Sequence, residues 1–155
     1  MSDNTPATSQ AITDNQALLA KAAAVLMLLA MLTGILVASA MTGQLAANPH
    51  SMLASHVNAI TGACWLGVLG WSLPWVRLGP AGLKRLTVLT MVPCYANWAV
   101  TLSKAFLGVV GVGLSKDPDN NLIFVLLGAL VVGPAIAATA TWSWALLRKG
   151  LVAAS

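Results

Sequence analysis

Four long apolar segments constrain the fold of this chain more than any other feature. They cover residues 17–41, 52–76, 83–110 and 122–147. Each is longer than the ~20 residues with which an α-helix crosses the ~30 Å hydrocarbon layer of a membrane. Of the 155 residues, 58% are hydrophobic and 8% are charged, whereas a soluble domain carries about 25% charged residues. The sequence therefore predicts an all-α membrane protein with one four-helix transmembrane bundle over residues 17–149.

The segments outside the bundle are short. Residues 1–16 are rich in Ser, Thr, Asn and Asp, a composition typical of a disordered tail, and residues 150–155 form a short C-terminal tail. The apolar run at 17–41 is longer than the ~7–15 residues of a signal-peptide core, and Asp3 and Asp14 precede it in place of basic residues. We therefore expect this run to be retained as the first membrane helix.

The basic residues predict the orientation of the bundle. Six of the eight lie on one side of the expected membrane, and Lys116 lies on the other side, beside two aspartates. Because cytoplasmic loops are enriched in Lys and Arg, we expect both termini to face the cytoplasm. The net charge of +4 then follows from topology and does not indicate a nucleic-acid partner. The six residues are Lys21, Arg77, Lys84, Arg85, Arg148 and Lys149.

One histidine lies inside a span, about two helical turns from its outer end. This residue is His56, and no span contains Asp or Glu. An ionisable group at membrane depth is costly and suggests a function. From the residues alone, His56 is a metal ligand, a pH-sensitive switch or a hydrogen-bonded packing residue. The missing carboxylates argue against a proton-coupled exporter. With His50 as the only other histidine, an electron carrier with two haems lacks axial ligands.

The third span carries a polar stripe. Asn97, Thr101 and Lys104 recur at i, i+4 and i+7 and share one helix face, and Pro93 is expected to kink the helix beside them. Counted from the outer end, His56 lies about 7 Å deep, Lys104 about 9 Å and Thr101 about 13 Å, so we expect the histidine to meet this stripe. Asn97 lies about 20 Å deep, and its contact with His56 would need a kink or a large ligand. The alternatives are interhelical hydrogen bonds for Asn97 and Thr101, and a snorkelling Lys104.

Other residues in the spans predict packing. Cys64 and Cys94 belong to no CxxC motif, so we expect two small buried thiols and neither a structural zinc site nor attached c-type haem. The fourth span carries a small residue at every fourth position, which lets another helix approach closely and predicts a packing or oligomer surface. The small residues are Ala129, Gly133, Ala137 and Thr141.

Short motifs in the second and third spans resemble a known family. Ala-Asn-Pro at 47–49 precedes Leu-Ala-Ser-His at 53–56, and the third span carries Tyr-Ala-Asn-Trp at 95–98 followed by Thr101. Over residues 17–148, the chain resembles the hydroxylaminobenzene mutases, bacterial membrane enzymes related to the styrene oxide isomerases. The resemblance implies a multi-pass protein of the bacterial cytoplasmic membrane that forms a homotrimer. It also implies one haem b per subunit, bound between neighbouring subunits.

The resemblance implies a reaction and a set of site residues. His56 would ligate the haem iron, and the reaction would be a redox-neutral rearrangement of an aromatic hydroxylamine such as hydroxylaminobenzene to a 2-aminophenol, as in aromatic degradation. The iron would act as a Lewis acid. The residues expected beside His56 are Trp98 and Asn58 at the haem, and Tyr95, Asn97 and Thr101 as catalytic residues at the substrate.

Two positions depart from the styrene oxide isomerase pattern. The isomerases carry an asparagine six residues after the haem histidine, where this chain has Gly62, and a tyrosine four residues after the third-span asparagine, where it has Thr101. Both departures argue against an epoxide substrate. An epoxide isomerase that gives an aldehyde is the nearest alternative, and a small four-span transporter or a structural membrane protein is the alternative of another class.

Overall fold

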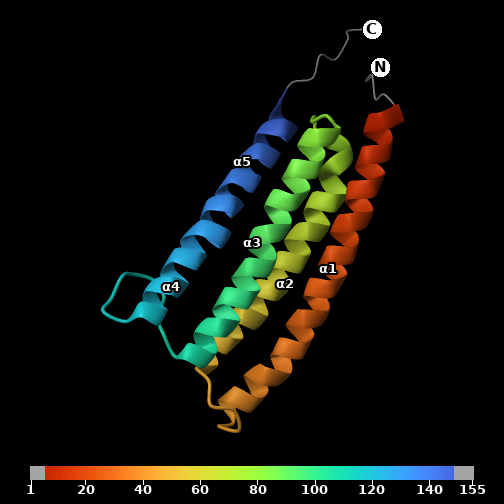
Figure 1. Ribbon diagram of the computed structural model, residues 1–155. Helices are drawn as coiled ribbons and strands as arrows, with labels where there is room; N and C mark the ends of the chain where they lie inside the picture. Colours follow the sequence, from red (N-terminus) through yellow and green to blue (C-terminus); the bar gives the residue numbers. More distant parts are fainter. Residues whose placement is uncertain (1–5, 149–155) are drawn as a thin grey trace.

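Four helical rods make up the part of the protein that the computed structural model describes, residues 6–148 (Figure 1). All four are long and apolar enough to cross a membrane, which confirms the predicted all-α bundle of four spans. The fourth rod, Pro118–Leu147, consists of three segments that run on without a break. The elements are α1 (Pro6–Met41), α2 (Pro49–Ser72), η1 (Leu73–Trp75), α3 (Pro80–Leu107), α4 (Pro118–Leu126), η2 (Leu127–Val132) and α5 (Gly133–Leu147).

Local sequence signals explain where the helices begin and end. Each of α2, α3 and α4 starts with a proline, whose fixed φ suits the first helical position and whose missing N–H costs nothing there. The side chain of Asn48 accepts a hydrogen bond from the backbone N–H of Ser51 and caps α2. At its other end, α3 stops at Gly108, which adopts φ +68°, a conformation that glycine takes without strain.

The first helix is longer than the sequence predicted. The expectation of a disordered tail over residues 1–16 is wrong for residues 6–16, which form the first turns of α1. Asn15 is buried, and Gln16 donates a hydrogen bond of 3.0 Å to the backbone oxygen of Gly70 on α2. These polar residues are thus ordered by packing against a neighbouring helix. Residues 1–5 and 149–155, which include the expected C-terminal tail, lie outside the described part of the chain.

The core lies among α1, α2 and α3. Fully buried leucines from all three helices form it, and the fourth rod packs mainly on α3 (Figure 1). In the most apolar 18-residue window of each span, 39% of residues are buried in the second and third spans but only 11% in the fourth. The fourth rod is therefore the least covered part of the bundle. Representative core residues are Leu19, Leu26, Leu66, Leu69, Leu83 and Leu86.

The N-terminal end of α1 and the C-terminal end of α5 lie at the same end of the bundle (Figure 1). The α2–α3 connection lies at the same end, because the backbone N–H of Arg77 in this connection donates to the backbone oxygen of Ala145 on α5. The basic residues Lys84 and Arg85 begin α3 at this end. We call it the basic end, and Asp117 and Asp119 lie at the opposite end, where α4 begins.

A π-helical turn interrupts the fourth rod. In η2 the backbone N–H of Gly133 donates to the oxygen of Gly128, five residues earlier. The next residue, Pro134, has no N–H to continue the α-helical pattern. The turn is widened where the proline removes a donor, and such turns are frequent at functional sites.

Candidate functional site

The imidazole of His56 faces α1. Its Nδ1 lies 2.7 Å from the backbone oxygen of Ala30, and the ring is half-buried. A carbonyl oxygen only accepts hydrogen bonds, so Nδ1 donates to it, which in the neutral form of an imidazole leaves Nε2 without a proton. The other nitrogen, Nε2, is then the atom with a free lone pair. Within residues 6–148, Nε2 has no hydrogen-bond partner.

A glycine in α1 makes room for this ring. A Cβ placed on Gly34 would lie 3.1 Å from Cε1 and 3.4 Å from Nδ1 of His56. Ala30 and Gly34 are one turn apart on α1, so the carbonyl that holds the ring and the gap that admits it lie on the same helix face. We call His56, Ala30 and Gly34 the imidazole site.

Trp98 of α3 reaches the same turn of α1. Its Nε1 donates to the hydroxyl of Thr33 at 3.0 Å, and its backbone oxygen accepts a hydrogen bond of 2.9 Å from Ser55 of α2. Tyr95 also points to α1, where its hydroxyl donates to the oxygen of Ala22 at 2.8 Å. Both aromatic residues therefore connect α3 to α1.

A second polar group lies between α2 and α3. The side-chain nitrogen of Asn58 donates to the Asn97 oxygen at 3.0 Å and to the Thr101 hydroxyl at 3.2 Å. Thr101 in turn donates to the Asn97 oxygen at 3.3 Å. We call these three residues the amide cluster. Within residues 6–148, the Asn58 oxygen and the Asn97 nitrogen keep unused hydrogen-bonding capacity.

A pocket of about 240 Å³ opens beside the amide cluster. Its walls come from α2, α3 and the fourth rod, including the π-helical turn. Because the two asparagine side chains lie among apolar and aromatic groups, the pocket suits a small aromatic molecule with one polar group. The lining residues are Asn58, Thr61, Gly62, Trp65, Pro93, Cys94, Asn97, Val131 and Ala135.

Comparison with known proteins places the chain in a family. The sequence model of the styrene oxide isomerases matches residues 15–147. The chain belongs to the styrene oxide isomerase family. It is also 34% identical over 86 residues to the hydroxylaminobenzene mutase HabB of Ectopseudomonas oleovorans, a match that covers 56% of this chain and 49% of that protein. The match thus spans about half of the relative's length, and no solved structure matches the chain.

In this member of the styrene oxide isomerase family, five of the six expected site residues fall into two groups, and Tyr95, whose hydroxyl donates to Ala22, belongs to neither. His56 and Trp98 meet at one turn of α1, whereas Asn58, Asn97 and Thr101 form the amide cluster. Successive helical residues turn by 100°, so Asn58 lies about 200° around α2 from His56. The expectation that His56 meets the polar stripe is therefore wrong within one chain.

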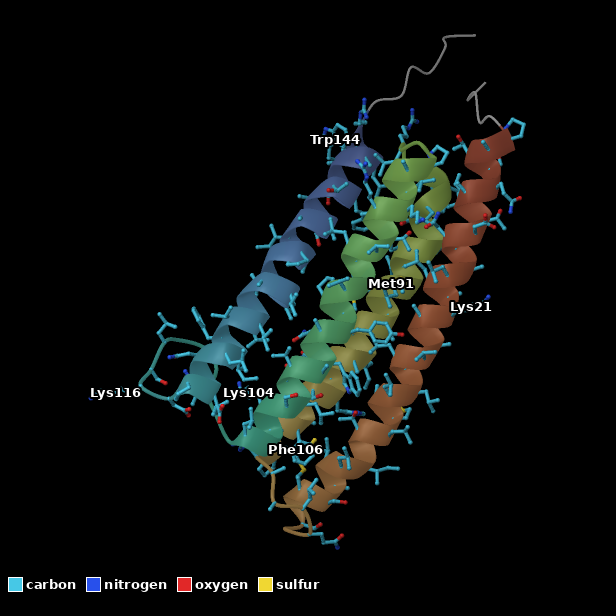
Figure 2. All side chains as sticks on the ribbon, in the orientation of Figure 1. Lys21, Met91, Lys104, Phe106, Lys116 and Trp144 are labelled. Carbon is cyan, nitrogen blue, oxygen red and sulfur yellow. The ribbon has the colours of Figure 1, made fainter. Side chains whose placement is uncertain are left out.

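Two other expectations are changed by the structure. Cys94 is buried as expected, but Cys64 is exposed, because it lies on the outward face of α2. Lys104 does not join the amide cluster; it is half-buried between α3 and α4 (Figure 2), and its Cδ lies 3.8 Å from the position of a Cβ on Gly111. Among residues 6–148, no three His, Cys, Asp or Glu residues come together as metal ligands.

The sequence did not reveal that α1 contributes to the imidazole site. The first span has few polar residues, and nothing in its pattern shows that the Ala30 carbonyl accepts from an imidazole. The available signal was Thr33-Gly34, a hydroxyl and a gap in the middle of an apolar helix. A glycine inside a membrane helix often marks a close approach by another group, and here that group is the His56 ring.

Proposed function

We propose that this protein is a membrane isomerase of the mutase type, which rearranges aromatic hydroxylamines such as hydroxylaminobenzene to 2-aminophenols with haem b as cofactor. Membership of the styrene oxide isomerase family and the partial match to a hydroxylaminobenzene mutase support an isomerase. The observation that carries the proposal is the imidazole site, since His56 is held through one ring nitrogen while the other has no partner among the described residues. We further propose that the protein lies in the bacterial cytoplasmic membrane with its basic end inside.

The imidazole site fits a histidine that would hold a haem iron through its second ring nitrogen. Metal-binding histidines usually donate their second ring N–H to a carbonyl or carboxylate, which fixes the tautomer and the ring orientation. The Nδ1 of His56 has this arrangement with Ala30. Trp98, which is held at the same turn of α1 by Thr33, supplies a flat aromatic neighbour. When bound, the haem iron supplies a Lewis acid for breaking the N–O bond.

The amide cluster and its pocket supply the substrate-binding part of the proposal. The Asn97 nitrogen and the Asn58 oxygen offer one donor and one acceptor to a hydroxylamino group, while Trp65 and Pro93 line the space for the ring. Thr101 holds Asn97 in place through its hydroxyl. Because this pocket is surrounded by apolar helices, it limits access of water to the polar group.

The separation of the two groups leads us to propose a homotrimer with one haem per subunit at the subunit interface. His56 is half-buried in a single chain, and its neighbours Leu53 and Val57 on α2 are exposed, so another subunit has room to cover this side. In a cyclic trimer each subunit contributes two different surfaces to its contacts. The imidazole site of one subunit then faces a different surface of the next, and the proposed active site is shared between chains.

A visible absorption spectrum of the detergent-purified protein, combined with turnover of hydroxylaminobenzene, tests the proposal. We expect the wild-type protein to show a Soret band and activity, and His56→Ala to lose both. His50→Ala is the matched control, because His50 is exposed at the start of α2 and has no place in either group. A wild-type protein without a Soret band, or a His56→Ala variant that retains haem and activity, contradicts the proposal.

An epoxide isomerase is the second candidate, favoured by the name of the matching family. Gly62 argues against it, because a Cβ there would lie 3.1 Å from Leu26 Cδ2 and 3.2 Å from Cys94 Cβ. A side chain at this position, such as the asparagine of the isomerases, would require Leu26 and Cys94 to shift by a few tenths of an ångström. Parallel assays with styrene oxide and hydroxylaminobenzene separate the candidates, and faster turnover of the epoxide would favour the second one.

A further inference from the structure

An open groove of about 570 Å³ runs between α3 and the fourth rod, and it shares no lining residue with the pocket beside the amide cluster. Its α3 residues recur at i, i+3 or i+4, i+7 or i+8 and i+11, so they form one helix face about 16 Å long. Two cationic side chains lie at the basic end of this face, and the remainder is apolar. The lining residues are Ala81, Lys84, Arg85, Val88, Leu89, Val92 and Pro134.

The cations of this groove lack anionic partners among the described residues. Neither Lys84 nor Arg85, both exposed in the first turns of α3, forms an ion pair within residues 6–148. Asp14 shares a separate depression between α1 and α3 with Lys84 without pairing with it. Asp117 and Asp119 lie at the opposite end of the bundle. The groove therefore combines two cations that have no anionic partner among the described residues with an apolar surface directly beside them.

We propose that this groove binds an anionic phospholipid. The phosphate lies at Lys84 and Arg85, and one acyl chain lies along Val88, Leu89 and Val92. The guanidinium of Arg85 binds phosphate oxygens in a bidentate manner, and the flexible ammonium of Lys84 adds a second contact. Both residues are within the first two turns of α3, where long basic side chains reach the headgroup region.

Charge favours a lipid over a second copy of the chain. The whole sequence contains four acidic residues, and of the three that are described, two lie at the far end of the bundle. A helix from another copy would cover the apolar face but would leave both cations without a partner. An anionic lipid pairs its phosphate with the two cations and covers the apolar part of the groove with an acyl chain.

Native mass spectrometry and thermal unfolding of the purified full chain, after exchange into a zwitterionic detergent, test this site. We expect phosphatidylglycerol to remain bound and to raise the melting temperature more than phosphatidylcholine of the same acyl chains. In Lys84→Gln/Arg85→Gln, the affinity for phosphatidylglycerol should fall about fivefold for each charge removed. The matched control is Arg77→Gln/Arg148→Gln, which removes two charges at the same end outside the groove.

A second variant tests the apolar half of the groove. Val92→Trp places a large side chain where the acyl chain lies, since Val92 is 42% exposed there, and it should reduce binding while leaving the charges unchanged. Equal losses in both charge variants, or a full preference for phosphatidylglycerol in Lys84→Gln/Arg85→Gln, would overturn the proposal. Equal stabilisation by inorganic phosphate would identify a free anion as the ligand. A subunit contact that Val92→Trp disrupts, in a protein to which phosphatidylglycerol does not bind, would identify a second copy.

Discussion

At the scale of single residues, Gly34 controls how the imidazole of His56 sits. Gly34→Ala should improve the intrinsic helix propensity of α1 by about 1 kcal/mol. The new Cβ, however, would press on the ring at 3.1 Å from Cε1 and displace it from the Ala30 carbonyl. Because loss of such an outer contact typically lowers metal affinity about 10–100-fold, we expect a comparable loss of haem affinity. Haem titration, followed by the Soret maximum and electron paramagnetic resonance, measures the change.

Gly67→Ala is the control for this prediction. Gly67 also lies within a membrane helix, but a Cβ there meets no atom within 4 Å. This variant should keep the haem affinity and the spectrum of the wild type. An unchanged Soret maximum and unchanged haem affinity in Gly34→Ala would show that α1 does not position the ring.

At the scale of secondary-structure elements, α2 separates two kinds of chemistry on two faces. Asn58→Ala removes the donor that holds Asn97 and Thr101. We expect kcat/KM for hydroxylaminobenzene to fall about tenfold, as for the loss of one hydrogen bond to the substrate. Stability should fall by about 1.2 kcal/mol, because two interhelical hydrogen bonds are lost and each contributes about 0.6 kcal/mol on average in a membrane protein. Steady-state kinetics and reversible unfolding in mixed micelles measure the two effects.

Thr61→Ala is the matched variant for Asn58→Ala. Thr61 lines the same pocket, but its hydroxyl donates to backbone oxygens of its own helix, those of Val57 and Asn58. Activity should change less than in Asn58→Ala. If both variants lose activity equally, the pocket's shape governs turnover and the amide of Asn58 has no specific part in it.

The same helix shows what the sequence could and could not predict. Hydropathy predicts the spans reliably, because a membrane requires long helices whose backbone groups are satisfied internally. Rotation of a helix is harder, because α2 is apolar on several faces and packing at Gly62 and Gly34 decides which face meets which neighbour. The two-residue offset between His56 and Asn58 nevertheless already implied opposite faces. The tail expectation failed because Gln16 finds a partner on α2, which composition does not reveal.

The π-helical turn is the second element with a testable role. Pro134→Ala restores a backbone N–H next to Gly133, whose own N–H is paired with Gly128 in the widened turn. A regular α-helix becomes possible there, so we expect stability to be unchanged or higher. Val131 and Ala135 line the pocket and would shift with the backbone, so the preference among ring-substituted hydroxylamines should change. Unfolding midpoints and relative kcat/KM values test this, and an unchanged substrate preference would contradict it.

At the scale of the whole molecule, the fourth rod is the span least covered by the other described helices. Of its most apolar window only 11% of residues are buried, and the four-residue repeat of small side chains leaves Gly133 and Ala137 exposed. Lipid tails cover large aliphatic side chains as well as another helix does. Small residues, in contrast, let a neighbouring helix approach closely, so their exposure favours a helix contact. The exposed face of α1 differs, since it carries large residues such as Leu28 and Ile35 and suits lipid.

Ala137→Leu should therefore weaken the proposed trimer. The larger side chain prevents close approach of a neighbouring helix at the small-residue face, and we expect subunits to dissociate in detergent. Since His56 is proposed to hold haem at the subunit boundary, haem should be lost together with the trimer. Native mass spectrometry reports the mass of the assembly and the mass of the bound haem in one experiment. Ala24→Leu, the same substitution at an exposed position of α1, should leave the assembly intact. A trimer that survives Ala137→Leu with its haem would place the subunit contact away from this face of the fourth rod.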